Sequence, residues 1–343
     1  MSLAHDAHEP QPAAHAAGEP QEDPTVPDHC ALGRWLSGPE LRCADGQLLS
    51  WHNPDHPGYP YPEATALWLS WAAWRREQQL PGPPRAAVQA TATWLLRQLS
   101  NGGAIGRDGR RYAFDTGLAF HALVRAARAP DLTTLQPQAL ALLSTGLEAF
   151  LEADAPVLPA SAAPERWSDR WLGHHLRSSA LVMQAGRWLG CEATQARAQS
   201  FLDRVTTTVA DQANYLHALS YQAEGELLLT SMGLADRTEH VLEVCVRLTQ
   251  LQRPDGLLPA WSQRPETARC DTTAQALRLW VATDPERFAA HGIAALGALK
   301  RCQHASGGLP YEPGRRDLNT WVGLFADQAL HWFAHGAEPA DLL

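Results

Sequence analysis

The chain has 343 residues, of which 45% are hydrophobic and 19% charged, and this composition and size exclude global disorder. No uninterrupted apolar run approaches the ~18 residues of a transmembrane helix, so membrane insertion is not expected. The formal net charge of −9 argues against a surface that follows a phosphate backbone, and nucleic acid is therefore excluded as an expected partner.

The first 28 residues differ from the rest of the chain. They carry Asp and Glu but no Lys or Arg, and they are rich in Pro, Ala and His. This composition predicts a disordered acidic tail over 1–28 and a single domain over 29–343. The tail lacks the basic and apolar stretches of a secretory signal, so we expect a cytoplasmic protein. The histidines of the tail have no fixed geometry, and we expect neither a metal nor a cofactor.

The six cysteines form no CxxC pair, which fits reduced thiols in a cytoplasmic protein. After residue 30, apolar residues recur at spacings of three and four positions, which predicts helices almost throughout. The expected helices span 31–37, 64–80, 84–99, 114–128, 136–152, 172–189, 192–209, 213–233, 236–251, 271–283, 285–301 and 319–336.

Four of the links between these helices share one pattern. A glycine turn at Gly46, Gly103, Gly256 or Gly307 precedes one or two apolar residues, as in a small hairpin, and a helix starts some way downstream. The unit repeats about every 51 residues, the length of two helices with their links. Six such units predict an all-α (α/α)6 toroid with an inner and an outer ring, while an open superhelix of helix pairs is the structural alternative.

In a toroid the inner helices start at one mouth, so polar residues at their N-terminal ends converge there. A His, a Tyr and a Glu at i, i+4 and i+7 lie on one helix face and can share proton transfers. Carboxylates in a partly dry cavity can serve as acid and base. The candidate catalytic residues are His217, Tyr221, Glu224, Asp115, Glu63 and Asp271.

Other residues near the same helix starts are suited to binding a substrate. Aromatic rings stack on sugars or enclose a hydrocarbon, and an arginine neutralises a carboxylate. The candidate substrate-binding residues are Trp51, His52, Tyr61, His175, Arg177, Tyr311, Asn319 and Trp321. We interpret His175 and Arg177 as the binders of an anionic group.

Structural roles are alternatives for several of these residues. Asp115, Asp271 and Asn319 are good helix caps, and Glu63 is a first-turn acid that the helix dipole favours. The set of His217, Tyr221 and Glu224 also fits a buried network between helices.

Several short motifs resemble a known group of proteins. They are Tyr61–Pro62–Glu63–Ala64–Thr65, Phe114–Asp115–Thr116–Gly117, His217-xxx-Tyr221-xx-Glu224–Gly225, Asn319–Thr320–Trp321 and Phe325-xx-Gln328–Ala329–Leu330. Over about residues 45–335 the chain resembles the helical-toroid proteins encoded with bacterial exopolysaccharide and surface-glycan pathways. The resemblance implies an (α/α)6 toroid related to sugar epimerases, lyases and glycoside hydrolases, and it leaves the reaction open.

A second resemblance concerns the segment from Cys270 to Arg278. It is similar to the acid motif of class II terpene cyclases, D-x-D-D-T-A followed by A-L-R, and Asp271 matches the proton-donating middle Asp. Arg269 and Thr272 stand where that motif has its first and last Asp.

The sequence therefore predicts a carbohydrate-active enzyme that uses acid–base chemistry on a glycan or a uronic-acid-containing sugar, as an epimerase, lyase or glycoside hydrolase. One alternative is a terpene-cyclase-like enzyme with Asp271 as proton donor. Another is a toroid that binds a glycan or peptide without catalysis. The expected partner is a small-molecule or oligosaccharide substrate, and the sequence indicates no particular protein partner.

Overall fold

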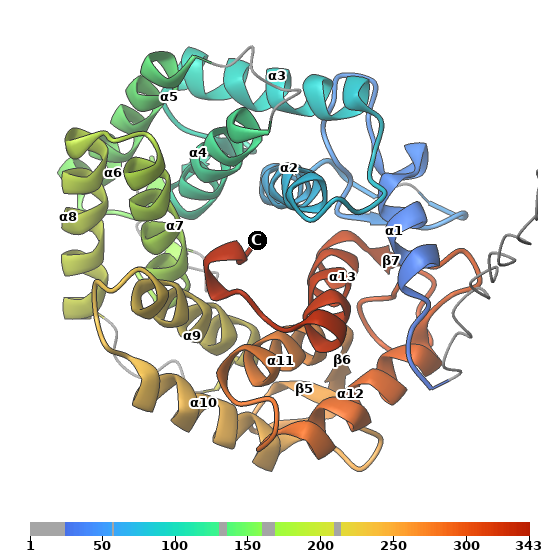
Figure 1. Ribbon diagram of the computed structural model, residues 1–343. Coiled ribbons are helices and arrows are strands. Elements are labelled where there is room, and N and C mark those ends of the chain that lie inside the picture. The colour runs from blue at the N-terminus through green and yellow to red at the C-terminus, as the bar shows by residue number, and fades with distance from the viewer. Residues whose placement is uncertain (1–24, 57, 130–135, 160–168, 209–213) are drawn as a thin grey trace, which may run out of the picture.

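The structure is a computed structural model that describes residues 25–56, 58–129, 136–159, 169–208 and 214–343. Most of the predicted tail, residues 1–24, therefore lies outside the described residues. The described helices form two concentric rings (Figure 1). The inner ring consists of α2 (Pro62–Glu77), α4 (Ala113–Arg128), α7 (His174–Trp188), α9 (Leu216–Ser231), α11 (Cys270–Thr283) and α13 (Thr320–His335).

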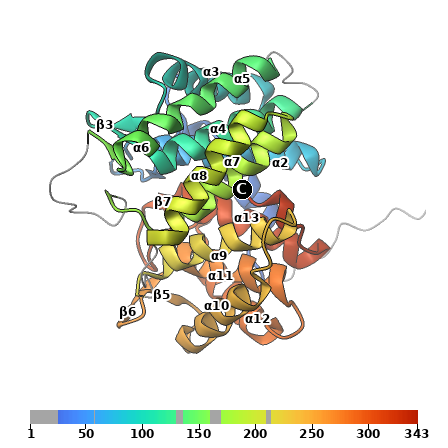
Figure 2. The ribbon, with the colours of Figure 1, turned by 90° about the vertical axis from the view of Figure 1, so that its left-hand side faces the viewer.

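The outer ring surrounds these helices, and Figure 2 shows α8 and α10 in front of the inner ring. It consists of α3 (Arg85–Gly102), the segment from α5 (Pro137–Leu143) through a 3-10 turn (Ser144–Leu147) to α6 (Glu148–Ala153), α8 (Glu192–Thr208), α10 (Thr238–Leu251), α12 (Ala289–Cys302) and α1 (His29–Ser37). The first helix, α1, packs on the last inner helix, α13. The ring is thus closed, and the predicted (α/α)6 toroid is confirmed in place of the open superhelix.

The two rings differ in how their sequences are buried. In α10 the buried residues are Val241, Val244, Cys245 and Leu248, which form a single stripe at helical spacing, so one face packs inward and the other meets solvent. In α11, by contrast, every residue from Cys270 to Val281 is buried. An inner helix is enclosed on all sides because it packs against two inner neighbours and an outer helix while its remaining face points into the ring.

One helix that was predicted to be continuous is interrupted in the structure. The segment 136–152 is expected to be a single helix, but it forms α5, a 3-10 turn and α6. Gly146 lies so close to the backbone of Gly103 that a Cβ at this position would overlap the Gly103 carbonyl oxygen. The chain forms a 3-10 turn at this contact. The serine and glycine in this turn also have low α-helix propensities.

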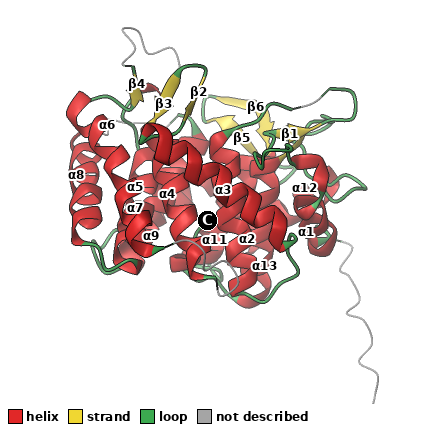
Figure 3. Cartoon of the chain, turned by 90° about the horizontal axis from the view of Figure 1, so that it is seen from above, coloured by secondary structure: helices red, strands yellow, loops and turns green. Residues whose placement is uncertain are grey.

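The links at the mouth of the toroid contain short strands. Figure 3 shows β1 to β6 along one edge of the helical body. The sheets are β1 (Trp51–His52) with β7 (Leu318–Asn319), β2 (Gly106–Arg107) with β3 (Arg110–Tyr112) and β4 (Val157–Leu158), and β5 (Leu258–Trp261) with β6 (Arg264–Arg269). The β1–β7 pair is antiparallel, with Trp51 opposite Asn319 and His52 opposite Leu318. It joins the first link to the last one and so closes the ring at the mouth.

The predicted glycine turns are also present. Gly46, Gly103, Gly256 and Gly307 all have positive φ, between 67° and 98°, a conformation that favours glycine.

The opposite end of the toroid is filled by the final residues of the chain, which reach the centre of the ring (Figure 1). Arg125, Gln184 and Gln328 donate hydrogen bonds to backbone carbonyls of residues 340–342. Deeper in the ring, Arg177 donates to the carbonyl of Leu343, which is fully buried. The inner helices therefore enclose a space that this segment closes at one end.

Candidate functional site

The second residue of each inner helix forms a ring at the mouth. These six residues are Glu63, Phe114, His175, His217, Asp271 and Trp321. Four of these residues, Glu63, His217, Asp271 and Trp321, line a cavity at this mouth, whereas Phe114 and His175 are buried and do not line it.

A repeated threonine fixes the start of three inner helices. The hydroxyls of Thr65, Thr116 and Thr273 each donate to the carbonyl four residues earlier. Each hydroxyl also accepts a hydrogen bond of 2.9–3.0 Å from a backbone N–H in the preceding link. The link and the helix are thereby held in a constant register, which determines the residue that points into the mouth.

The mouth holds a cavity of about 470 Å³, within the ~300–1,000 Å³ typical of small-molecule sites. Its lining includes eight of the predicted site residues: Trp51, Tyr61, Glu63, His217, Asp271, Tyr311, Asn319 and Trp321. Tyr59, Arg107, Tyr215 and Asp317 complete the lining.

Glu63 is the carboxyl group on one side of the cavity. Its Oε1 accepts a hydrogen bond of 2.9 Å from the hydroxyl of Tyr221, and it also interacts with the side chain of Trp321. Burial raises the pKa of Glu63, and this effect outweighs the opposing effects of Tyr221 and the nearby charge of Arg177. Glu63 is thus placed to hold a proton.

Asp271 is a second carboxyl group on the cavity and has a different environment. Arg269 binds it in a bidentate manner, with Nε at 2.9 Å and Nη2 at 2.6 Å. His217 lies 3.5 Å away through Nδ1. Burial alone would raise the pKa of Asp271, but the charges of Arg269 and His217 outweigh burial and lower it. Glu63 and Asp271 therefore line one cavity with pKa values shifted in opposite directions.

Asp115, the third residue of α4, does not line the cavity. It is 4% exposed, and its Oδ2 has no hydrogen-bond partner among the described residues. Burial, followed by the negative charge of Glu63, raises the pKa of Asp115 well above its ordinary value. The structure thus places Asp115 behind the wall, close to Glu63.

Aromatic rings cover one side of the cavity. Trp51, Tyr59, Tyr61 and Trp321 follow one another with centroid separations of 4.7, 5.8 and 5.1 Å. The guanidinium of Arg107 lies 4.0 Å from the ring centroid of Tyr61, and its buried Nε has no hydrogen-bond partner among the described residues. The cavity thus combines stacking surfaces, a guanidinium cation and three carboxyl groups, those of Glu63, Asp271 and Asp317.

Three other predicted residues lie deeper in the ring. Glu224 is fully buried and forms ion pairs with Arg177, at 2.9 Å, and with Arg278. This network lies beneath the ring of Tyr221, because the Arg177 guanidinium is 4.7 Å from its centroid. His175 is also fully buried, and its ring packs against Phe114 and Trp171. Glu224, Arg177 and His175 do not line the cavity, and the charge of Arg177 is balanced within the core.

Two predicted residues have specific positions near the rim. His52 faces a separate groove on the other side of the β1–β7 pair. Asn319 lines the cavity and also caps α13, since its side chain accepts a hydrogen bond of 3.1 Å from the Val322 N–H. Asp115 and Asp271 form no such helix-capping bond. The capping alternative therefore applies to Asn319 but not to these two aspartates.

Arg107, Tyr215 and Asp317 line the cavity but are not among the site residues predicted from the sequence. Arg107 does have a sequence signal. It precedes Asp108–Gly109, both with positive φ, which form the tight turn between β2 and β3. An Asp-Gly pair is a strong hairpin signal, and the hairpin directs Arg107 to the mouth. Tyr215 and Asp317 lie in irregular links, where periodicity gives no information.

The described part of the chain shows neither a metal-binding cluster nor a membrane-spanning helix. Among these residues no group of three or more His, Cys, Asp and Glu side chains is arranged to hold a metal ion. No helix among them is long and apolar enough to cross a membrane.

Comparison with known proteins gives matches of structure only. No family model and no curated sequence matches the chain. The unsaturated glucuronyl hydrolase of Bacillus sp. GL1, described as responsible for the degradation of glycosaminoglycan, has a TM-score of 0.65 at 14% identity, over 89% of this chain and 95% of that one. An unsaturated glucuronyl hydrolase specific for heparin has a TM-score of 0.62 at 11% identity, over 91% and 96%.

A third match belongs to another reaction class. The type II terpene cyclase MstE from Scytonema has a TM-score of 0.54 at 17% identity, over 90% of this chain and 97% of that one. Both resemblances expected from the sequence thus have structural counterparts. The chain shares the (α/α)6 toroid fold of the unsaturated glucuronyl hydrolases and, at lower similarity, that of a type II terpene cyclase.

Proposed function

We propose that the mouth cavity is the active site of a glycoside hydrolase that removes a terminal acidic sugar from a glycan. The observation that carries this proposal is the pair formed by Glu63 and Asp271. These residues line one cavity, and their surroundings shift their pKa values in opposite directions. Carboxyl groups with separated pKa values are suited to act as acid and base at the same pH.

In the proposed reaction Glu63 is the general acid. It donates its proton to the glycosidic oxygen as the bond from that oxygen to the anomeric carbon breaks. Asp271 is the general base, which takes a proton from the water molecule that forms the new bond to the anomeric carbon. Tyr221 orients the Glu63 carboxyl, while Arg269 keeps Asp271 ionised.

The remaining lining supports an acidic sugar as substrate. The aromatic rings of Tyr61 and Trp321 offer faces on which a sugar can stack. Arg107 offers a guanidinium whose Nε is not engaged within the described residues, and guanidinium groups bind carboxylates in a planar, bidentate way. This assigns to Arg107 the anion-binding role that the sequence analysis gave to His175 and Arg177.

The terpene-cyclase alternative is less well supported. A class II cyclase requires a protonated Asp facing a mostly apolar cavity, whereas Asp271 is ion-paired with Arg269 and its pKa is lowered. The cavity also presents Arg107, His217 and Asp317. The alternative of non-catalytic binding is disfavoured because Glu63 is held in an environment that favours its protonated form.

The test is turnover of defined disaccharides by the full chain. The panel contains a terminal uronate, its 4,5-unsaturated form and a matched neutral sugar, together with an isoprenoid diphosphate for the alternative. We expect release of the uronate, measured by mass spectrometry, and a loss of about 10²–10⁴-fold in turnover in Glu63→Gln and in Asp271→Asn.

Glu239→Gln makes the same chemical change on the exposed surface of α10 and is the matched control. Arg107→Met should lower turnover of the uronates more than turnover of the neutral sugar. Full turnover in Glu63→Gln, or conversion of the isoprenoid alone, would contradict the proposal.

A further inference from the structure

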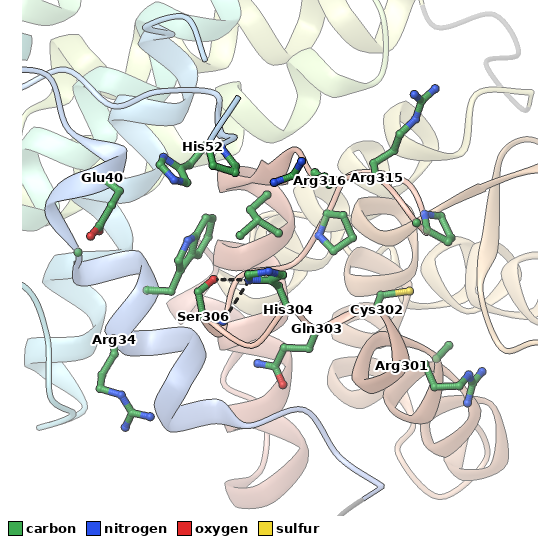
Figure 4. A pocket seen from close by; sticks show the side chains of 18 of the residues that line it. Arg34, Glu40, His52, Arg301, Cys302, Gln303, His304, Ser306, Arg315 and Arg316 are labelled. Carbon is green, nitrogen blue, oxygen red and sulfur yellow. Dashed lines mark hydrogen bonds between the residues drawn. The ribbon is translucent and has the colours of Figure 1, made fainter. Parts of the chain in front are cut away.

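A second cavity lies on the side of the toroid next to the mouth. It is a groove of about 920 Å³ between α1, the end of α12 and the link that precedes α13 (Figure 4). Four arginines, Arg34, Arg301, Arg315 and Arg316, line it, against two acidic residues, Glu40 and Asp255. In a chain with a net charge of −9, this is a local concentration of positive charge.

The groove and the active-site cavity share a wall. In β1, Trp51 lines the cavity and the next residue, His52, lines the groove. In β7, Asn319 lines the cavity and Leu318 lines the groove. Neighbouring residues of a strand point to opposite faces, so one two-stranded ribbon separates the two spaces. A ligand that leaves the mouth over this ribbon reaches the groove directly.

The arginines of the groove are accessible to a ligand. Arg34 is exposed and has no ion pair or hydrogen bond to a side chain among the described residues. Arg315 pairs with Glu312, and Arg316 pairs with Asp55; in both pairs the two side chains are at least 45% exposed. Exposed pairs of this kind contribute little to stability, so the arginines can exchange these partners for an anionic ligand.

We propose that this groove binds the sugar units of an acidic polysaccharide that follow the terminal unit held in the mouth. The inference rests on the proposed function, because it assumes that the mouth holds the end of a glycan. The ligand class is a chain with a carboxylate or sulfate on successive sugars, since guanidinium groups recognise these anions by charge and planar geometry. The exposed prolines in the lining, Pro39, Pro54 and Pro313, offer apolar faces for the sugar rings between the charges.

The experiment measures binding by calorimetry at low salt. The probes are galacturonate oligomers of two and six units and a neutral glucose oligomer of six units, and the protein is the full chain. We expect the acidic hexamer to bind more tightly than the acidic dimer, with an affinity that falls as salt is added. The double variant Arg34→Ser/Arg315→Ser should weaken hexamer binding about tenfold and leave dimer binding unchanged.

The matched control is Arg85→Ser/Arg97→Ser, which removes two exposed arginines of α3 that do not line the groove. It changes the net charge equally and should bind the hexamer as the wild type does. A hexamer that binds no better than the dimer, or binds equally to both double variants, overturns the groove assignment. Cleavage of the terminal uronate can persist in that case, so the two proposals fail separately.

A different occupant would give a different result. Residues 1–24 contain five acidic side chains and no Lys or Arg, and they precede α1, where the backbone of Asp28 bonds to Gln303 of the groove. The five acids can be changed to Asn and Gln in the full chain. If the acidic hexamer binds more tightly than the dimer only in that variant, the groove is normally occupied by the chain's own N-terminal segment, and the glycan proposal is wrong.

Discussion

At the scale of single residues, the proposed reaction depends on which carboxyl group holds a proton. Glu63, Asp115 and Asp271 are all buried near one mouth, yet only Asp271 has an arginine bound to it in a bidentate manner. The pKa of Asp271 is lowered, while burial raises the pKa values of Glu63 and Asp115. The same type of side chain is thus prepared for different roles by its neighbours.

This difference predicts a bell-shaped pH profile of kcat/KM. Activity should fall at low pH as Asp271 takes up a proton, at a pH below the ordinary aspartate value of about 3.9. It should fall at high pH as Glu63 loses its proton, above the ordinary glutamate value of about 4.3. Steady-state rates over pH 3–8 test this, with circular dichroism as the check that folding is retained. A profile whose alkaline limb is unchanged in Glu63→Gln would show that another group supplies the proton.

Asp115 gives a prediction about stability. Its pKa is raised in the folded state, so between the unfolded and folded pKa values the folded state binds a proton that the unfolded state has released. The free energy of unfolding therefore falls as the pH rises through this range. Asp115→Asn should remove that fall, so its stability relative to the wild type should increase from pH 4 to pH 7. Urea unfolding at both pH values measures the difference, and a constant offset between the two proteins would contradict the raised pKa.

At the scale of elements, each inner helix is positioned by the link before it. The glycine turns in three of these links lie against the backbone of an outer helix. A Cβ on Gly46, Gly256 or Gly307 would come within 2.2–2.6 Å of a carbonyl oxygen in α3, α12 or α1, respectively. Each turn therefore needs glycine for two reasons, its positive φ and its close contact with the outer helix. The position of the turn then fixes where the following residues enter the mouth.

The turn at Gly256 can be tested against a turn that has space around it. Gly256→Ala combines a φ of +84° with the contact to the Ala294 carbonyl, and it should reduce the free energy of unfolding by about 2–4 kcal/mol. Gly233→Ala has a φ of +69° and nothing within 4 Å, so it should cost about 1 kcal/mol. Equal losses in chemical denaturation would mean that the contact with α12 has no effect.

The helices and the toroid could be predicted because periodicity and the repeated glycine turns are local signals. The register at each helix start could not be predicted with the same accuracy. Asp115 and Asp271 both stand near the start of a predicted inner helix, yet their distances from Thr116 and Thr273 show that Asp115 is one position further along its helix. That shift of one residue, about 100° around a helix, moves Asp115 out of the cavity. The partners of Glu224 also escaped prediction, since Arg177 and Arg278 come from two other helices.

At the scale of the whole molecule, the ring is held together by contacts between distant parts of the chain. The β1–β7 pair and the packing of α1 on α13 close the circumference. The final residues close the axis, with Leu342 1% exposed and the backbone carbonyls around it bonded to Arg125 and Gln328. Leu342 and Leu343 therefore belong to the core, while Pro339–Asp341 stay partly exposed.

A pair of leucine variants tests the contribution of this segment. Leu342→Ala removes a buried side chain and should lower the free energy of unfolding by about 2–5 kcal/mol. Leu142→Ala makes the same change at a side chain that is 69% exposed, where less than about 0.5 kcal/mol is expected. Thermal and urea unfolding provide the measurement. Similar stabilities of the two variants would show that the final segment is not an integral part of the core.

The segment at the bottom of the ring also limits how a long polymer could be degraded. Among the described residues the final segment fills one end of the axis, so a sugar released in the proposed reaction should leave through the mouth, where the rest of the polymer would be bound. We therefore expect the polymer to dissociate before the next cut, so that the proposed hydrolysis is distributive and proceeds from the chain end. A digest of an acidic hexamer should accordingly accumulate pentamer first and then tetramer, whereas early accumulation of monomer beside intact hexamer would show that the polymer stays bound between cuts.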